Sequence, residues 1–316
     1  MYFPIANIEI NPLIPPAVAF VISFFTSMGG VSGAFLLLPF QVSVLGFNTP
    51  AVSATNQLFN IVAIPSGVYR YIKEGRMVWP LTWVVIVGTL PGVLLGAIIR
   101  IKYLPDPRNF KMFVGVILLY IGSRLLKDIL AKKKKLKGEL SAEEQFQKLI
   151  KEFNANKSAE DQQLPKVSVK EFSLTRISYD FYGQNFNINS IGIMTLSGIV
   201  GIVGGVYGIG GGAIIAPFFI SFFGLPVYTI AGAALMGTFV TSIAGVIFYQ
   251  IIAPFYPDMA ISPDWLLGFL FGIGGFAGMY CGARAQKHVP AKAIKWILTG
   301  CIIFTASKYI ISYFLK

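Results

Sequence analysis

A chain of 316 residues with 55% hydrophobic and only 13% charged residues excludes an ordinary soluble protein, in which about a quarter of the residues are charged. Its net charge of +12 would suit a nucleic-acid-binding protein. The basic residues, however, lie at the ends of apolar runs and in one polar insert, where they orient membrane spans toward the cytoplasmic leaflet. Several runs exceed the roughly 18 apolar residues of a membrane span. We therefore predict an all-α polytopic protein of the cytoplasmic membrane.

The apolar runs form two groups of four, separated by a polar insert. In chain order they cover about 13–47, 51–72, 78–100 and 110–130, then 190–224, 228–252, 263–283 and 293–315. Glycines interrupt the first run of each group, at Gly29–Gly33 and at Gly204–Gly212. We therefore predict a first membrane part over 1–130, a cytoplasmic insert over 131–188 and a second membrane part over 189–316.

The insert begins with a lysine-rich run and is expected to fold outside the membrane. Ser141 and Glu144 form a capping box at the start of an apolar helical stripe, which predicts a helix over 141–153. The stretch 167–189 predicts one or two short strands with a turn near Gly183. Since neither segment has a phosphate-binding loop or metal-ligand spacing, we expect a structural or docking role, which leaves open a cytoplasmic partner.

The two groups of runs are copies of each other. An offset of 178 residues overlays Gly30 on Gly208, Gly33 on Gly211, Pro39 on Pro217 and Tyr71 on Tyr249. Beyond the next loop, an offset of 184 residues overlays Gly88 on Gly272, Arg100 on Arg284 and Arg124 on Lys308. Because the register holds through four segments, we predict an internal duplication.

The orientation of the second copy depends on whether the broken runs cross the membrane. If both cross, the basic loops 100–111 and 284–295 both lie outside, against the rule that cytoplasmic loops are basic. If each broken run is a re-entrant hairpin with its glycines at the tip, each half has three crossings and the second copy is inverted. The 253–264 loop, which has two aspartates and no Lys or Arg, is then properly external, and only the 100–111 loop stays basic outside. The charge rule therefore favours two inverted repeats.

Paired breaks at matching positions of inverted repeats indicate a substrate site near the midplane. The second arm of each hairpin begins with free N–H groups and the positive end of a helix dipole, which favour an anion. We assign four tip residues to the substrate site: Ser32, Gly33, Gly210 and Gly211. The alternative is that such glycines only allow tight helix crossing, which is our interpretation of the four-residue glycine spacing in 88–96 and 274–282.

The run after each hairpin carries polar side chains that share one helical face. We assign these to the substrate site as well: Asn56, Asn60, Thr238, Thr241 and Ser242. Intramembrane amides are costly without a partner, so the two asparagines are either interhelical contacts or ligand contacts. Gln57 points elsewhere on the helix, which favours a helix contact.

The remaining polar residues of the runs give no catalytic site. No carboxylate lies deep in a run, so we predict no buried proton relay. Arg124 and Lys308 reach furthest into a run, where they either snorkel or attract an anion at opposite mouths of the pathway. A lone His288 and two cysteines expected in helix packing, Cys281 and Cys301, cannot form a metal cluster. We therefore expect neither an enzyme nor a cofactor.

The duplicated patterns GGVSGAFLLLPF (29–40) and GIGGGAIIAPFF (208–219) resemble the sulfite exporter TauE/SafE family of membrane permeases. SATNQLFNIVAIPSGVYRYIKEGRM (53–77) resembles the first-half pattern of this family closely, whereas 131–188 lies outside its common core. The resemblance implies transport of a small sulfur-containing anion, such as sulfite, sulfoacetate or another organosulfonate, and it implies export as the direction.

Together, these features predict a secondary transporter in which one repeat or its hairpin moves against the other around a midplane site. Two alternatives stay open: an anion channel of the same architecture, and a membrane scaffold or receptor that signals through the insert. A homo-oligomer is compatible with each of them.

Overall fold

The computed structural model describes residues 1–28, 31–73, 75, 77–130, 167–173, 175–181, 184–223, 225, 227–285 and 291–315. Within these ranges the chain is mostly helical, and five helices contain a stretch long and apolar enough to cross a membrane. These are α5 (Trp79–Lys102), α6 (Pro107–Leu130), α8 (Ser190–Tyr207), α10 (Val227–Ile252) and α11 (Trp265–Ala285). The predicted all-α polytopic membrane fold is confirmed.

The other helices are shorter or less uniformly apolar. They are α1 (Ile14–Met28), α2 (Ala34–Ser43), α3 (Ala51–Ala63), α4 (Pro65–Lys73), α9 (Ile215–Phe223), the 3-10 helix η1 (Ala253–Phe255) and α12 (Ala291–Phe314). The strands β1 (Tyr2–Phe3) and β2 (Ile8–Glu9) precede α1 in the chain and pair with each other.

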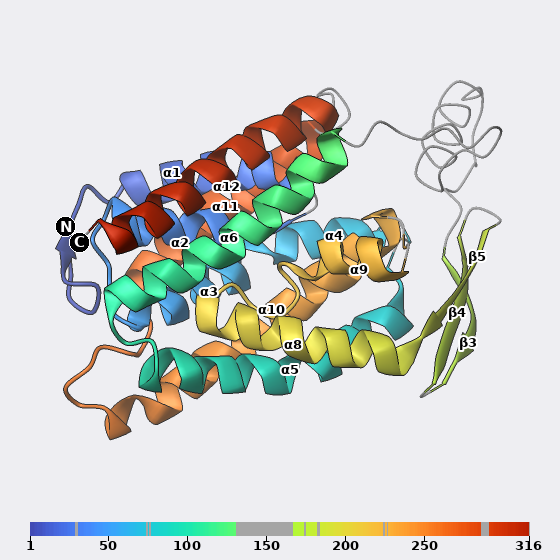
Figure 1. Ribbon diagram of the computed structural model, residues 1–316, viewed down its shortest axis with the longest axis horizontal. Helices are drawn as coiled ribbons and strands as arrows, with labels where there is room; N and C mark the ends of the chain where they lie inside the picture. Colours follow the sequence, from blue (N-terminus) through green and yellow to red (C-terminus); the bar gives the residue numbers. More distant parts are fainter. Residues whose placement is uncertain are drawn as a thin grey trace.

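The long helices run between two ends of the molecule. In Figure 1 both chain termini lie at the left, and the strands β3 (Ser168–Phe172), β4 (Arg176–Phe181) and β5 (Gln184–Asn189) lie at the right. We call these the termini end and the sheet end. Helices α5 and α10 run from the sheet end to the termini end, whereas α6 and α11 run the opposite way (Figure 1).

The first broken run, α1 and α2, leaves from and returns to the termini end. The backbone N–H of Ala6, before α1, donates to Asp264 Oδ2 at 3.3 Å, and the N–H of Asp264 donates to Thr55 Oγ1 in α3 at 2.9 Å. The start of α1 and the start of α3 therefore lie together. With ten residues, α2 is about 15 Å long, too short for a hydrocarbon core of about 30 Å.

The second broken run, α8 and α9, is anchored at the sheet end instead. Helix α8 follows β5 directly, and Tyr179 of β4 donates to Thr229 Oγ1, in the first turn of α10, at 3.1 Å. With nine residues, α9 is about 14 Å long and also too short to cross. Two hairpins that enter from opposite ends support the inverted repeat, which stays a prediction.

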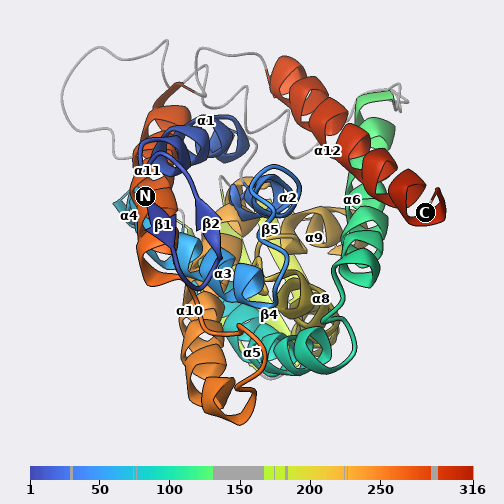
Figure 2. The same cartoon turned by 90° about the vertical axis from the view of Figure 1, so that its left-hand side faces the viewer.

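The main helix pairs each join one half of the chain to the other. Helix α5 packs along α8, α1 along α11, and α6 along α12, and Figure 2 shows these pairs around a centre that holds α2, α3 and α9. A Cβ at Gly92 of α5 would overlap the carbonyl oxygen of Gly198, and one at Gly278 of α11 would overlap that of Phe20. The prediction that these glycine ridges serve close packing is confirmed.

Two predicted boundaries are wrong. The run over 51–72 is divided into α3 and α4 at Pro65, which has no N–H to continue the helix. The second break begins at Gly208 (φ 77°) rather than at Gly204. The second arm, α9, starts at Ile215. Gly204 lies inside α8, and its glycine is required because a Cβ there would overlap the carbonyl oxygen of Gly210.

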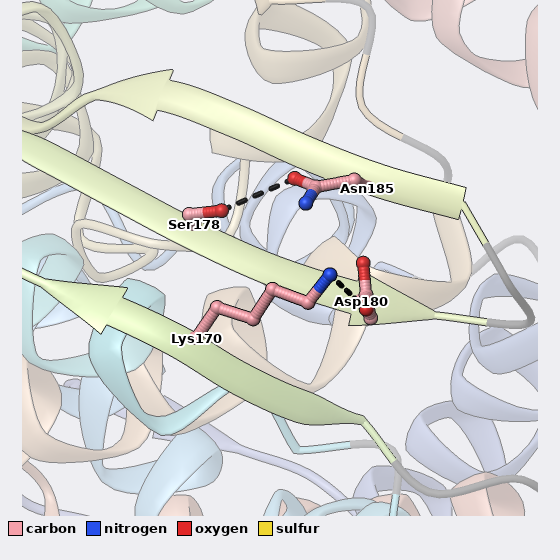
Figure 3. Close-up of polar contacts among 4 residues, drawn as sticks. All are labelled: Lys170, Ser178, Asp180 and Asn185. Carbon is pink, nitrogen blue, oxygen red and sulfur yellow. Dashed lines mark hydrogen bonds and ion pairs between the residues drawn. The ribbon is translucent and has the colours of Figure 1, made fainter.

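The region 167–189 forms three antiparallel strands in the order β3–β4–β5, not the predicted one or two. Ser173 makes the missed turn, since its N–H donates to Arg176 O at 2.8 Å and its Oγ accepts from Arg176 N at 3.0 Å. Figure 3 shows Lys170 paired with Asp180 at 2.5 Å and Ser178 donating to Asn185 at 3.1 Å. The predicted helix over 141–153 and the turn near Gly183 lie outside the described residues.

We expect Tyr179→Phe to loosen the sheet and to change its response to alkali. The variant lacks the hydroxyl that donates to Thr229 Oγ1, and this hydrogen bond is worth about 1 kcal/mol. Burial raises the pKa of Tyr179 from 10 to about 12, so the protonated phenol stabilises the fold fully below pH 10. This contribution disappears between pH 10 and 12, when the unfolded chain releases its proton first. The free energy of unfolding, measured at pH 8 and 11, checks this.

Tyr103→Phe is the matched control, because Tyr103 is 73% exposed. If the wild type and the Tyr179 variant lost the same stability between the two pH values, Tyr179 would not be the titrating group.

Candidate functional site

The two glycine-rich breaks meet at the middle of α3, where Asn56 joins them. Its Nδ2 donates to Ala34 O, at the start of α2, and to Gly208 O, in the second break, each at 3.0 Å. Its Oδ1 accepts from Gln41 Nε2 at 3.1 Å. Both donors of this amide and one acceptor position are therefore used within the protein.

One turn further along α3, Asn60 repeats the arrangement. Its Nδ2 donates to Ile209 O at 2.9 Å and to Ser242 Oγ of α10 at 3.4 Å. Its Oδ1 accepts from Ser32 Oγ at 2.6 Å, and Ser32 Oγ also accepts from the N–H of Ala34 at 3.3 Å. Asn60 thus links the tip of the first hairpin to the tip of the second.

Helix α10 holds the second break from the other side. The N–H of Gly211 donates to Thr241 Oγ1 at 3.0 Å, while Thr238 Oγ1 donates to Ala234 O at 2.8 Å. A Cβ at Gly210 would lie 2.8 Å from Ser242 Oγ, so the break packs directly on this face of α10. The absence of a side chain is required here for close packing, which was the alternative interpretation of these glycines.

We call these contacts the central network: Ser32, Ala34, Gln41, Asn56, Asn60, Gly208, Ile209, Gly211, Thr241 and Ser242. The polar side chains in it are fully buried, and so is that of Thr238. Unwound backbone in a membrane must find partners inside the protein, and the asparagines of α3 supply them. The structure thus brings together the predicted tip and stripe residues, including Gly33 at the start of α2, with their donors directed to protein atoms.

The hairpins are also tied to each other and to outer helices. Tyr207, at the end of α8, donates to Phe35 O in α2 at 2.6 Å. Tyr309 of α12 donates to Pro39 O at 3.2 Å, and the rings of Tyr120 in α6 and Phe218 in α9 stack 5.5 Å apart. The second arm of each hairpin therefore rests on an outer helix from the opposite half.

Arg124 and Lys308 are not brought to the central network. They belong to α6 and α12, the pair at the right of Figure 2, and Arg124 is half-buried whereas Lys308 is exposed. In the described part of the chain, no hydrogen bond joins either residue to the central network. Their placement fits the snorkelling alternative.

Three buried residues were not singled out from the sequence as part of a site or a cap. Asp264 lies in a loop as expected, but it is buried and caps α11 by accepting from Leu267 N at 3.1 Å. Arg100 is fully buried, donates to the carbonyl of Leu104, and lies 3.8 Å from the ring centre of Phe110. Gln57 packs on Gly245 of α10. Long-range contacts determine the positions of Asp264 and Arg100, which local patterns did not reveal, whereas the packing of Gln57 on α10 agrees with the helix contact predicted for it.

The described residues contain free cysteines but no cluster of metal ligands. Among the residues that the structure describes, no three His, Cys, Asp or Glu side chains are grouped to hold a metal ion. Cys281 and Cys301 are free and exposed, so the expectation that they pack between helices is wrong.

Helices long and apolar enough to cross a membrane, two interrupted helical runs and a buried polar network where their breaks meet are the features of a polytopic membrane protein. The chain belongs to the sulfite exporter TauE/SafE family, whose sequence model matches residues 16–309. Its class is therefore that of a membrane transporter for small anions, not an enzyme. Searches of curated proteins and of solved structures gave no match.

Proposed function

We propose that the protein carries a small sulfur-containing anion, such as sulfite, sulfoacetate or another organosulfonate, by alternating access in the direction of export. The observation that carries this proposal is the position of Asn56 and Asn60. Both side chains belong to the first half of the chain, yet both donate to backbone carbonyls of the second break.

Separation of the two halves would free hydrogen-bond donors of the central network close to one another. As Asn60 leaves Ile209 O, its amide becomes available next to Ser32 Oγ, and the N–H of Gly211 becomes available as it leaves Thr241. An oxyanion is a suitable acceptor for such a group of donors, which come from the α3 amide, the start of α2 and the backbone of the second break. In this conformation the network is sealed, so the substrate exchanges places with contacts inside the protein.

The charge distribution supports a cytoplasmic sheet end. Arg70 and Lys73 close α4 at that end, and the 253–264 loop at the other end has no Lys or Arg, so that the 100–111 loop is the one basic connection there. The positive-inside rule therefore supports a topology in which the sheet and the insert face the cytoplasm and the chain termini face the outside of the cytoplasmic membrane.

Thermal shift of the purified protein tests the proposal. The panel is sulfite, sulfate, sulfoacetate, taurine, thiosulfate and acetate. We expect sulfite or a sulfonate to raise Tm, and we expect this shift to disappear in Asn60→Ala and Gly211→Leu. A side chain at Gly211 would overlap Thr89, whereas Gly300 has open space around it, so Gly300→Leu is the matched control. A shift that survives both variants, or no shift at all, would remove the central anion site.

Flux measurements distinguish a carrier from a channel of the same architecture. In proteoliposomes a carrier saturates as the sulfite concentration rises, because each substrate requires a conformational cycle. The buried state of Asn56, Asn60 and Ser242 favours the carrier, since a continuous pore would leave them wet. Flux that stays proportional to concentration would favour the channel.

A further inference from the structure

Three fully buried side chains at the interface of α3, α5 and α10 have donors without a hydrogen-bond partner among the described residues. Gln57 has neither amide atom paired and Arg100 has Nε and Nη2 unpaired, while the hydroxyl of Tyr249 has only Ser53 Oγ as a neighbouring acceptor and makes no hydrogen bond of normal geometry to it. Buried donors in folded proteins almost always have an acceptor, so a donor without one indicates that an ion or a ligand can supply the acceptor.

The three side chains follow one another toward the termini end. Gln57 Oε1 lies where a Cβ of Gly245 would be, and Tyr249 is one turn further along α10. Tyr249 lies beside Ser53, one turn back from Gln57 on α3, and within electrostatic range of Arg100. The row therefore starts next to the asparagines of the central network and ends near the last turn of α5.

The free atoms of Arg100 have a geometry suited to an oxyanion. Nη1 donates to the carbonyl of Leu104, and the ring of Phe110 covers one face of the guanidinium. Nε and Nη2, which remain, form the side-on pair that binds two oxygens of one planar or tetrahedral anion. Asp106 is within electrostatic range, but its Oδ2 accepts from Asn109 N at 2.9 Å, and Arg100 makes no ion pair within the described ranges.

We propose that Gln57, Tyr249 and Arg100 form an anion path from the central network to the termini end, with Arg100 as its terminal binding subsite. The ligand class is a small oxyanion with at least two acceptor oxygens, of which sulfite is the simplest probe. This inference rests on the proposed function, because it names the route by which the carried anion leaves the central site.

Binding of sulfite to the full-length purified protein, measured by calorimetry, is the first test. We expect Arg100→Gln to weaken the apparent Kd about tenfold or more and Tyr249→Phe to weaken it about threefold, since each removes donors to a charged ligand. Arg100→Lys keeps the charge without the side-on pair and should fall between wild type and Arg100→Gln. Arg108→Gln is the control: it removes the same charge at the same end, where Arg108 is exposed and donates to Tyr313 O.

The variant Gln57→Met tests whether Gln57 belongs to the anion path or has only a structural role. Because both amide atoms of Gln57 are unpaired, an apolar side chain of similar shape should keep or raise Tm without ligand. The same variant should lower the rate of sulfite transport in proteoliposomes, which a purely structural residue would not do.

The outcomes are distinguishable. If the wild type binds and transports sulfite and the variants of Arg100, Tyr249 and Gln57 all behave like Arg108→Gln, the path is wrong and the proposed function stands. If the wild type binds no anion of the panel, the proposed function itself fails, and the path fails with it. Should Arg100→Gln not fold, Tyr249→Phe and Gln57→Met decide the question.

Discussion

Asn56→Ala is expected to lower the free energy of unfolding by roughly 3–5 kcal/mol and to abolish anion transport. The change leaves two buried carbonyls, of Ala34 and Gly208, without their donor, and it leaves the Gln41 amide without its acceptor. Each orphaned buried group costs about 1–3 kcal/mol. Unfolding in detergent, followed by circular dichroism, measures the first effect, and proteoliposome flux measures the second.

Two further variants sharpen this test. Asn56→Asp keeps the shape but replaces the donors by a buried negative charge facing two carbonyls, so it should be at least as damaging. Asn109→Ala is the control, because the side chain of Asn109 is exposed, and we expect a change within about 0.5 kcal/mol. A stable Asn56→Ala protein with wild-type flux would show that the breaks do not depend on α3.

Gly92→Leu is expected to give the other large effect, the loss of a monodisperse folded protein. The backbone of α8 lies where the Cβ would be, at Gly198 and Gly201, and backbone cannot move aside as a side chain can. Even Gly92→Ala should cost about 1–3 kcal/mol, the usual range for an overpacked core, because α5 and α8 must separate. Size-exclusion profiles and Tm measure both variants.

The matched control is Gly300→Leu in α12, where a Cβ meets no atom within 4 Å. That change should be neutral or slightly stabilising, since leucine has the higher helix propensity. Equal damage at Gly92 and Gly300 would indicate that glycine content, not the contact between α5 and α8, matters.

Features that depend on local composition could be predicted from the sequence. Span positions follow from apolar length, and the ridge at Gly92 follows from a four-residue spacing of small side chains. The extra strand was missed because its turn, at Ser173, has neither glycine nor proline in the positions that usually mark a turn.

The site could be predicted only in part, because the sequence does not show which partner each polar group finds. The stripe that includes Asn56 and Asn60 was located correctly on α3, but both amides are used by backbone of the second break, more than 140 residues away. The burial of Arg100 was missed because its helix ends two residues later, where snorkelling is the usual expectation.

The exchange of helix partners between the halves has a consequence for biogenesis. When the ribosome has delivered only the first half, the glycine face of α5 and the inner face of α1 have no partner, since α8 and α11 are still to be made. The first half must then wait in the lipid as loosely associated helices, exposed to membrane proteases. Expressed alone, it should be degraded, whereas two separately expressed halves should protect each other and assemble.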